Sequence, residues 1–164
     1  MNDESQKPQP DEYYHSKRVK KLRPKMDCDL HETQSLSKSK VVGKAKKGKE
    51  YKVVDIWKKG DKSTDMSRYK IEFEKGKYGW ISGNMKYIDS VYYLDCKYTG
   101  KTKIKALKNT GACSDVALQK EVEKIKKGDV FTAVDNVTDK AGYPRLKLKS
   151  GKYVTARKDY WKFV

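Results

Sequence analysis

The side chains best suited to covalent or metal chemistry are three cysteines, Cys28, Cys96 and Cys113, and two histidines, His15 and His31. A structural zinc site needs about four Cys or His ligands at tight spacings, and no Cys-x-x-Cys pair is present. A Cys/His hydrolase needs a nucleophile beside an oriented His, whereas Cys28 and His31 lie in a stretch of weak strand character. We therefore predict no metal and no cofactor, and we interpret the cysteines as buried free thiols.

Other catalytic patterns are also missing. A glycosidase needs two carboxylates facing one cleft, but the acids here fall mostly on the outer faces of alternating strands. The sequence contains no His-Glu-x-x-His, no Gly-x-x-x-x-Gly-Lys-Ser/Thr and no Gly-x-Ser-x-Gly. The chain is therefore predicted not to be an enzyme itself.

Aromatic and basic residues offer chemistry of another kind, the noncovalent binding of a ligand. Residues beside the loops and turns of the predicted strands could stack on a sugar or peptide, or contact phosphate or carboxylate groups. Seven side chains meet this description: Trp57, Tyr69, Tyr78, Tyr143, Arg145, Tyr153 and Arg157. Trp80, in contrast, is interpreted as a core residue.

The net charge of +17 favours a polyanionic partner such as nucleic acid, anionic lipid or the phosphate chains of a bacterial wall. Lys outnumbers Arg by 34 to 5. Lysine is a point charge that meets scattered phosphates, whereas arginine supplies the planar fork used to recognise bases. The charge therefore favours a loosely ordered polyanion over a specific DNA sequence.

Short alternating runs with Gly turns predict β-strands at 19–22, 27–33, 41–45, 50–57, 69–73 and 76–82, with 85–88 closing the unit. The pattern then recurs. Lys126-Lys127-Gly128 repeats Lys46-Lys47-Gly48, residues 129–135 match 49–55 with Phe131 for Tyr51, and the turn Gly151-Lys152-Tyr153 repeats Gly76-Lys77-Tyr78. We also expect a linking strand at 91–94, a turn at 109–111, and strand or helix over 116–125.

This repeat predicts an all-β chain of two tandem small, strongly bent β-barrels packed together. The domain boundaries we expect are a flexible tail or linker over residues 1–17, a first copy over 18–90 and a second copy over 91–164. No run is apolar enough for a membrane span and no secretion signal opens the chain. We accordingly expect synthesis in a host cytoplasm and no membrane partner.

The stretches KVVGKAKKGKEYKVVD (40–55) and KGKYGWISG (75–83) resemble the bacterial SH3-like (SH3b) family. The second copy departs from that pattern at Val154 and Thr155, and GKYVTARKDY (151–160) is similar to the Lys-rich SH3-like repeats of lactobacillar surface proteins and phage lysins. The resemblance covers about residues 18–164, and it implies that both barrels are SH3-like.

The resemblance also implies a function. Tandem modules of this family are the non-catalytic cell-wall-binding domains of phage endolysins, autolysins and bacteriocins of Gram-positive bacteria, and they bind peptidoglycan or teichoic acid. The expected partners are such a wall polymer and the catalytic part or full-length form of a lytic enzyme, with action at the Gram-positive wall. Two alternatives stay open: a basic barrel that binds RNA or single-stranded DNA, and a fragment of a surface-layer or adhesion protein.

Overall fold

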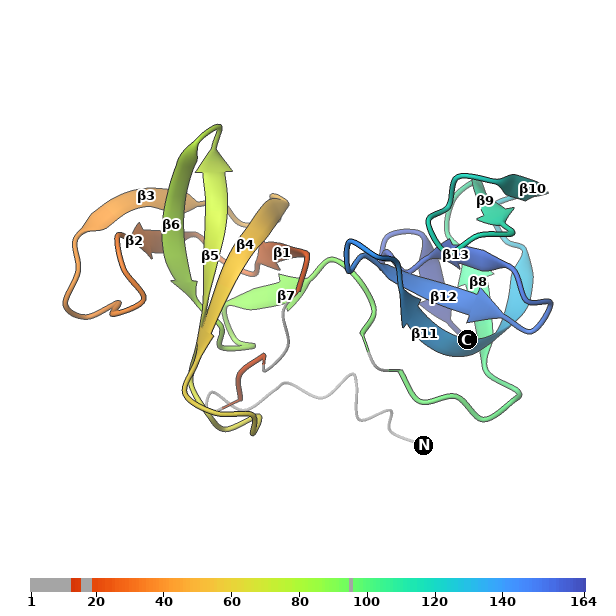
Figure 1. Cartoon of the computed structure of the whole chain (residues 1–164), viewed down its shortest axis with the longest axis horizontal. Helices are drawn as coiled ribbons and strands as arrows, with labels where there is room; N and C mark the ends of the chain where they lie inside the picture. The colour runs from red at the N-terminus through yellow and green to blue at the C-terminus, as the bar shows by residue number, and fades with distance from the viewer. Residues whose placement is uncertain (1–12, 16–18, 95) are drawn as a thin grey trace. The chain divides into compact units, whose positions relative to one another are not determined.

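The computed structural model describes residues 13–15, 19–94 and 96–164, and the chain divides between Ser90 and Val91 into two compact units (Figure 1). The described residues form strands, turns and loops but no helix. The predicted fold class, all-β with two tandem small β units, is thus confirmed. The described part of the chain also contains no helix that could cross a membrane.

Each unit is built on one seven-stranded antiparallel sheet. The first contains β1 (Lys21–Pro24), β2 (Cys28–His31), β3 (Val41–Ala45), β4 (Tyr51–Lys58), β5 (Ser67–Glu74), β6 (Lys77–Ser82) and β7 (Ile88–Ser90). The second contains β8 (Lys103–Ala106), β9 (Thr110–Cys113), β10 (Glu121–Ile125), β11 (Val130–Thr138), β12 (Pro144–Leu148), β13 (Tyr153–Thr155) and β14 (Trp161–Phe163). The spatial orders, β3-β2-β6-β5-β4-β1-β7 and β10-β9-β13-β12-β11-β8-β14, are the same order in two copies. The predicted repeat is therefore confirmed at the level of topology.

In each unit, one long strand bends the sheet on itself. β11 pairs with β8 over residues 130–132 and with β12 from Ala133 onward, and the β11–β12 pairing has a β-bulge between Ala133 and Asp135. β4 has its bulge at the equivalent place, between Val53 and Asp55. A bulge bends and twists its strand, so one strand can belong to two differently oriented parts of a sheet. The sheet consequently curls around a core.

Alternation along the strands selects the core residues. Tyr69 and Ile71 are fully buried in the first unit, and Ile104, Leu146 and Trp161 are fully buried in the second. Each buried aliphatic or aromatic side chain of this kind contributes roughly 1.5–3 kcal/mol by leaving water. Trp80 is 9% exposed, which agrees with its interpretation as a core residue.

Glycines with positive φ make the repeated turns. Gly48 and Gly128 have φ of 78° and 96°, and Gly76 and Gly151 have φ of 74° and 87°. Residues with a Cβ rarely adopt this conformation, so glycine is the residue that these turns need. The two predicted pairs of turns are confirmed.

The register of the strands corrects one part of the predicted repeat. Tyr153 pairs with Lys147 and Cys113, whereas Trp80 pairs with Lys70 and His31. Tyr153 therefore occupies the place of Trp80, not that of Tyr78, because the β5–β6 hairpin is longer than the β12–β13 hairpin. The second copy thus keeps an aromatic residue where the first has its tryptophan.

A short leading segment, residues 13–15 in the first unit and 91–93 in the second, precedes the strands of each copy. The amide of His15 donates to Gly83 O (2.9 Å), and the carbonyl of Tyr13 accepts from the Met85 amide (3.0 Å). Equivalent bonds join residues 91 and 93 to residues 158 and 156. Residues 13–15 therefore belong to the first copy and not to the predicted tail, while the rest of residues 1–17 lies outside the described residues.

Four local expectations also change. Residues 91–94 form no strand, although Tyr92 makes an isolated bridge with Arg157. The turn expected at 109–111 is the start of β9, and the helix considered over 116–125 is a loop followed by β10. Of the three cysteines, all free thiols, Cys113 is buried whereas Cys28 and Cys96 are only partly buried.

Candidate functional site

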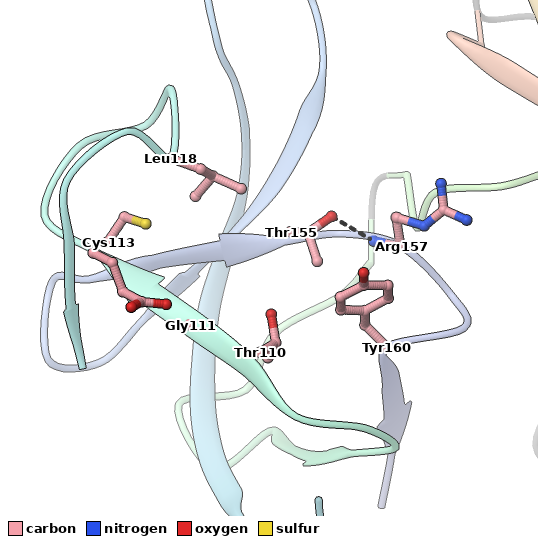
Figure 2. A pocket seen from close by; sticks show the side chains of 8 residues that line it. Thr110, Gly111, Cys113, Leu118, Thr155, Arg157 and Tyr160 are labelled. Carbon is pink, nitrogen blue, oxygen red and sulfur yellow. Dashed lines mark hydrogen bonds between the residues drawn. The ribbon is translucent and has the colours of Figure 1, made fainter. Parts of the chain in front are cut away.

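A pocket of about 290 Å³ opens on the second unit. Its lining comes from β9, β10, β13, the loop between β9 and β10, and the turn before β14: Thr110, Gly111, Cys113, Leu118, Glu121, Thr155, Arg157 and Tyr160. Figure 2 shows Cys113 and Leu118 at one end of the pocket and Arg157 and Tyr160 at the other. The lining therefore combines hydroxyl groups, one guanidinium, one carboxylate, one aromatic ring and one aliphatic side chain.

The strands β9 and β13 form this pocket by separating. They pair at Cys113 and Tyr153, and beyond that pair Thr110 and Thr155 both line the pocket. Thr155 Oγ1 also accepts a hydrogen bond from the Arg157 amide (3.3 Å), which fixes the chain where it leaves β13 (Figure 2). The sheet itself thus holds the two threonines in place.

Gly111 makes room for the carboxylate of the pocket. A Cβ at Gly111 would overlap the Glu121 carboxylate and would lie 2.9 Å from Glu121 Cγ. The Glu121 side chain consequently lies across the bare backbone of β9. Glycine is needed here for the close approach of a side chain, not for a turn.

An ion pair with Asp159 holds the Arg157 side chain in position. Its Nε and Nη2 atoms donate to Asp159 Oδ1 (2.9 Å) and Oδ2 (3.1 Å), and Lys108 Nζ lies 3.3 Å from the same carboxylate. Burial raises the pKa of Asp159, but the bonds and charges of Arg157 and Lys108 outweigh burial, and the pKa is lowered. The ring of Tyr160 lies beneath both cations, 4.3 Å from Lys108 Nζ and 5.8 Å from Arg157 Cζ. The guanidinium is therefore preorganised, since a bidentate pair fixes its plane.

Cys113 is a poor nucleophile in this setting. Burial raises the pKa of its thiol, and the negative charges of Asp115 and Glu121 raise it further. The described residues also contain no group of three or more His, Cys, Asp or Glu side chains that could hold a metal ion. The hydroxyl, guanidinium and carboxylate groups of the lining are chemically suited to contact with a polar molecule.

Of the seven predicted contact residues, only Arg157 lines this pocket. Tyr153 is partly buried beside it, and its strand neighbour Cys113 is a lining residue. Tyr143 is partly buried and packs edge-to-face on Tyr92, with ring centroids 6.3 Å apart. Of the four predicted side chains in the second copy, one thus lines the pocket and three, Tyr143, Arg145 and Tyr153, do not.

Arg145 has a structural role that the sequence did not reveal. It is 9% exposed, and it donates to Val116 O (3.1 Å) and to Asp139 Oδ2 (3.2 Å). These bonds tie the β9–β10 loop to the β11–β12 hairpin. An arginine already satisfied in this way has little left to offer a ligand.

The predicted contacts of the first copy differ in exposure. Trp57 is 36% exposed and Tyr78 is 43% exposed, with Lys70 Nζ 5.5 Å from the Tyr78 ring centroid. Tyr69 is fully buried, burial raises its pKa, and its hydroxyl donates to His15 O (3.3 Å). Tyr69 therefore has no free face for stacking, and we do not retain it as a contact residue.

Strand register identifies the residues of the first unit that are equivalent to the two charged residues of the pocket. Glu121 pairs with Cys113, as Val41 pairs with His31, so valine replaces the carboxylate. Arg157 and Asn84 are each the isolated-bridge residue after the sixth strand of their copy, so asparagine replaces the arginine. The two charged groups of the pocket thus belong to the second copy alone.

Most of the lining could not be chosen from the sequence. Thr110, Leu118, Glu121 and Thr155 belong to no motif, and the sequence around Gly111 predicts a turn. Arg157 was predicted, and among the other lining residues the usable signal is Tyr160, which lies in the aromatic run that closes the second copy.

One known family matches the chain: a domain of unknown function (DUF5776) matches residues 92–160, which fall within the second unit. No curated protein matches. It is thus the second copy, the one that contains the pocket, that is similar to the DUF5776 domain.

Proposed function

We propose that this chain is a non-catalytic module that binds a Gram-positive cell-wall polymer, peptidoglycan or teichoic acid, and so places a lytic enzyme or a companion subunit on the wall. The observation that carries this proposal is the polar pocket of the second copy in a chain of net charge +17. Three hydroxyl groups and a preorganised guanidinium suit a sugar or a short peptide.

The basic surface supports the same proposal in a second way. Wall teichoic acids are polyphosphates, and a lysine-rich surface attracts them over long range in a salt-dependent manner. A chain that binds RNA or single-stranded DNA would share this attraction. It would also need exposed aromatic rings along a basic groove, and the described residues show only scattered ones, such as Trp57 and Tyr78.

The proposal is tested by sedimentation with purified Gram-positive walls, before and after removal of teichoic acid. Tyr160→Phe removes one pocket hydroxyl and keeps the ring, and we expect about a five-fold loss of binding, as for one hydrogen bond of about 1 kcal/mol. Tyr87→Phe at the equivalent position of the first copy is the matched control and should bind like the parent. If the parent chain sediments with neither wall preparation, the proposed function is wrong.

A gel shift at physiological salt tests the nucleic-acid alternative. Binding to RNA or single-stranded DNA that survives at this salt, without sequence preference, would favour that alternative over the wall.

A further inference from the structure

On the second unit, two lysines face each other across neighbouring strands. Lys105 of β8 is the register partner of Lys162 of β14 on one side and of Val130 of β11 on the other. All three side chains are exposed. Like charges directly opposite on a sheet repel each other, so this pair costs the folded unit stability.

More lysines continue this surface. Lys103, two residues before Lys105, points to the same side and donates from Nζ to Thr132 Oγ1 (2.6 Å). The turn with Lys126 and Lys127 lies at the end of β8, because the Gly128 amide donates to Ala106 O (2.8 Å). We call Lys103, Lys105, Lys126, Lys127 and Lys162 the lysine face. Among the described residues, none of these five side chains takes part in an ion pair.

The first unit neutralises the same place. Arg23 stands where the second unit has Lys105, its register partner is Asp89, and its Nη2 atom lies 2.6 Å from Glu50 Oε1. In the next row of cross-strand neighbours, the register partners of Lys52 in β4 are Lys21 in β1 and Glu72 in β5. Each of these two rows in the first copy therefore contains at least one acidic side chain beside a basic one.

Nearby acids do not neutralise the second copy in the same way. Asn109 accepts the Lys127 amide where Asp27 accepts the Lys47 amide in the first copy. The acid in this region is Asp129, whose Oδ2 accepts the Lys126 amide (2.9 Å) and so holds the turn. The row from Val130 through Lys105 to Lys162 thus carries two positive charges and no negative one.

We propose that the lysine face binds the phosphodiester backbone of an anionic wall polymer of the teichoic-acid type. The identity of the polymer rests on the proposed function, whereas the location rests on the register and the ion pairs. Lysines two residues apart on a strand are separated by about 6.5–7 Å, so successive phosphates of an extended chain can each meet a separate ammonium group. The exposed apolar residue in this row is Val130 and not an aromatic residue, so the row offers bases nothing to stack on.

The experiment compares two double variants of the full chain that change the net charge equally. Lys105→Glu with Lys162→Glu alters the lysine face, and Lys21→Glu with Lys52→Glu alters the cross-strand lysine pair of the first copy. Binding to purified poly(glycerol phosphate) teichoic acid is measured at low and physiological salt, with thermal unfolding as a check on folding. Lys105→Gln with Lys162→Gln replaces the first variant if it does not fold.

We expect the lysine-face variant to lose at least about ten-fold in affinity and to lower the slope of log K against log salt by about 0.7 for each lost contact. The first-copy variant should stay within about three-fold, because a change in net charge alone acts weakly at physiological salt. Equal losses in both variants would show a general field effect and overturn the inference.

Two further outcomes separate the inference from the proposed function. If the parent chain binds walls and the lysine-face variant binds teichoic acid as well as the parent, the inference fails and the proposed function stands. If the parent binds neither walls nor teichoic acid, the proposed function fails. If a single-stranded oligonucleotide binds more tightly than teichoic acid and the same two lysines carry that binding, the occupant is nucleic acid and the inference is overturned.

Discussion

Two glycines of the second copy, replaced singly by alanine, should affect different properties. The replacement of Gly128 should lower the stability of the unit, and the replacement of Gly111 should change the shape of the pocket. Gly128 has a φ of 96°, and a Cβ placed on it would meet nothing within 4 Å. Gly111 is the opposite case, because its Cβ would overlap the end of the Glu121 side chain. The first substitution strains the backbone and the second displaces a flexible side chain.

The two cases differ in expected magnitude. A side chain in the left-handed region costs about 1–2 kcal/mol, so Gly128→Ala should lower the melting temperature of the unit by about 5–15 °C. Gly111→Ala should change stability by less than about 1 kcal/mol, because Glu121 can rotate away and alanine restricts the unfolded chain. It should nevertheless weaken wall binding, because moving the Glu121 carboxylate changes the shape and the charge of the pocket that it lines.

Scanning calorimetry and wall sedimentation below the melting temperature measure the two effects. Gly128→Ala should bind walls like the parent chain, and Gly111→Ala should melt like it. Loss of stability in Gly111→Ala as large as that in Gly128→Ala would refute this account of why glycine occupies position 111.

Three further substitutions test the packing and the ion pair. Tyr69→Phe should cost about 1 kcal/mol and speed hydrogen exchange at the His15 amide, and unchanged exchange there would contradict the contact with the leading segment. Because the pKa of Asp159 is lowered, its charge stabilises the fold above the ordinary carboxyl pKa of about 4, and that contribution is lost as pH falls through the lower folded value. Asp159→Asn should therefore flatten the acid limb of a stability-against-pH curve, and a limb as steep as the parent's would argue against the pair with Arg157. Trp161→Ala should cost about 3–5 kcal/mol and unfold or nearly unfold the second unit, whereas a melting temperature close to the parent's would show that the site collapses around the lost ring.

The strands with regular alternation could be predicted from the sequence, because burial of one face leaves a period of two. Tyr69 and Ile71 show this in β5, and the Lys-Lys-Gly turns mark the start of the longest strand of the second copy at the right place. The repeat could likewise be predicted, since its turns need glycine with positive φ at Gly48 and Gly128.

The site was harder to predict because the pairing register of the strands decides which residues lie side by side. Gly111 looks like a turn residue in sequence, yet it lies in a strand and makes room for Glu121, ten positions along the chain. The length of a hairpin likewise makes Tyr153 the counterpart of Trp80. The Gly-Lys-Tyr sequence shared by the two copies instead aligns Tyr153 with Tyr78. Whether an aromatic residue beside a loop is exposed also depends on packing, as the burial of Tyr69 shows.

The leading segments bear on how such a module can be excised or duplicated. In each copy the chain first pairs with the turn before its own last strand, so a complete copy begins several residues ahead of its first strand. A chain trimmed to begin at residue 18 would leave the Met85 amide without its carbonyl partner from Tyr13, whereas one trimmed to begin at Val91 would keep the equivalent bond. Because the first unit ends at Ser90 and the second begins at Val91, copies can follow one another along a chain without an added linker, each already containing the leading segment that completes it.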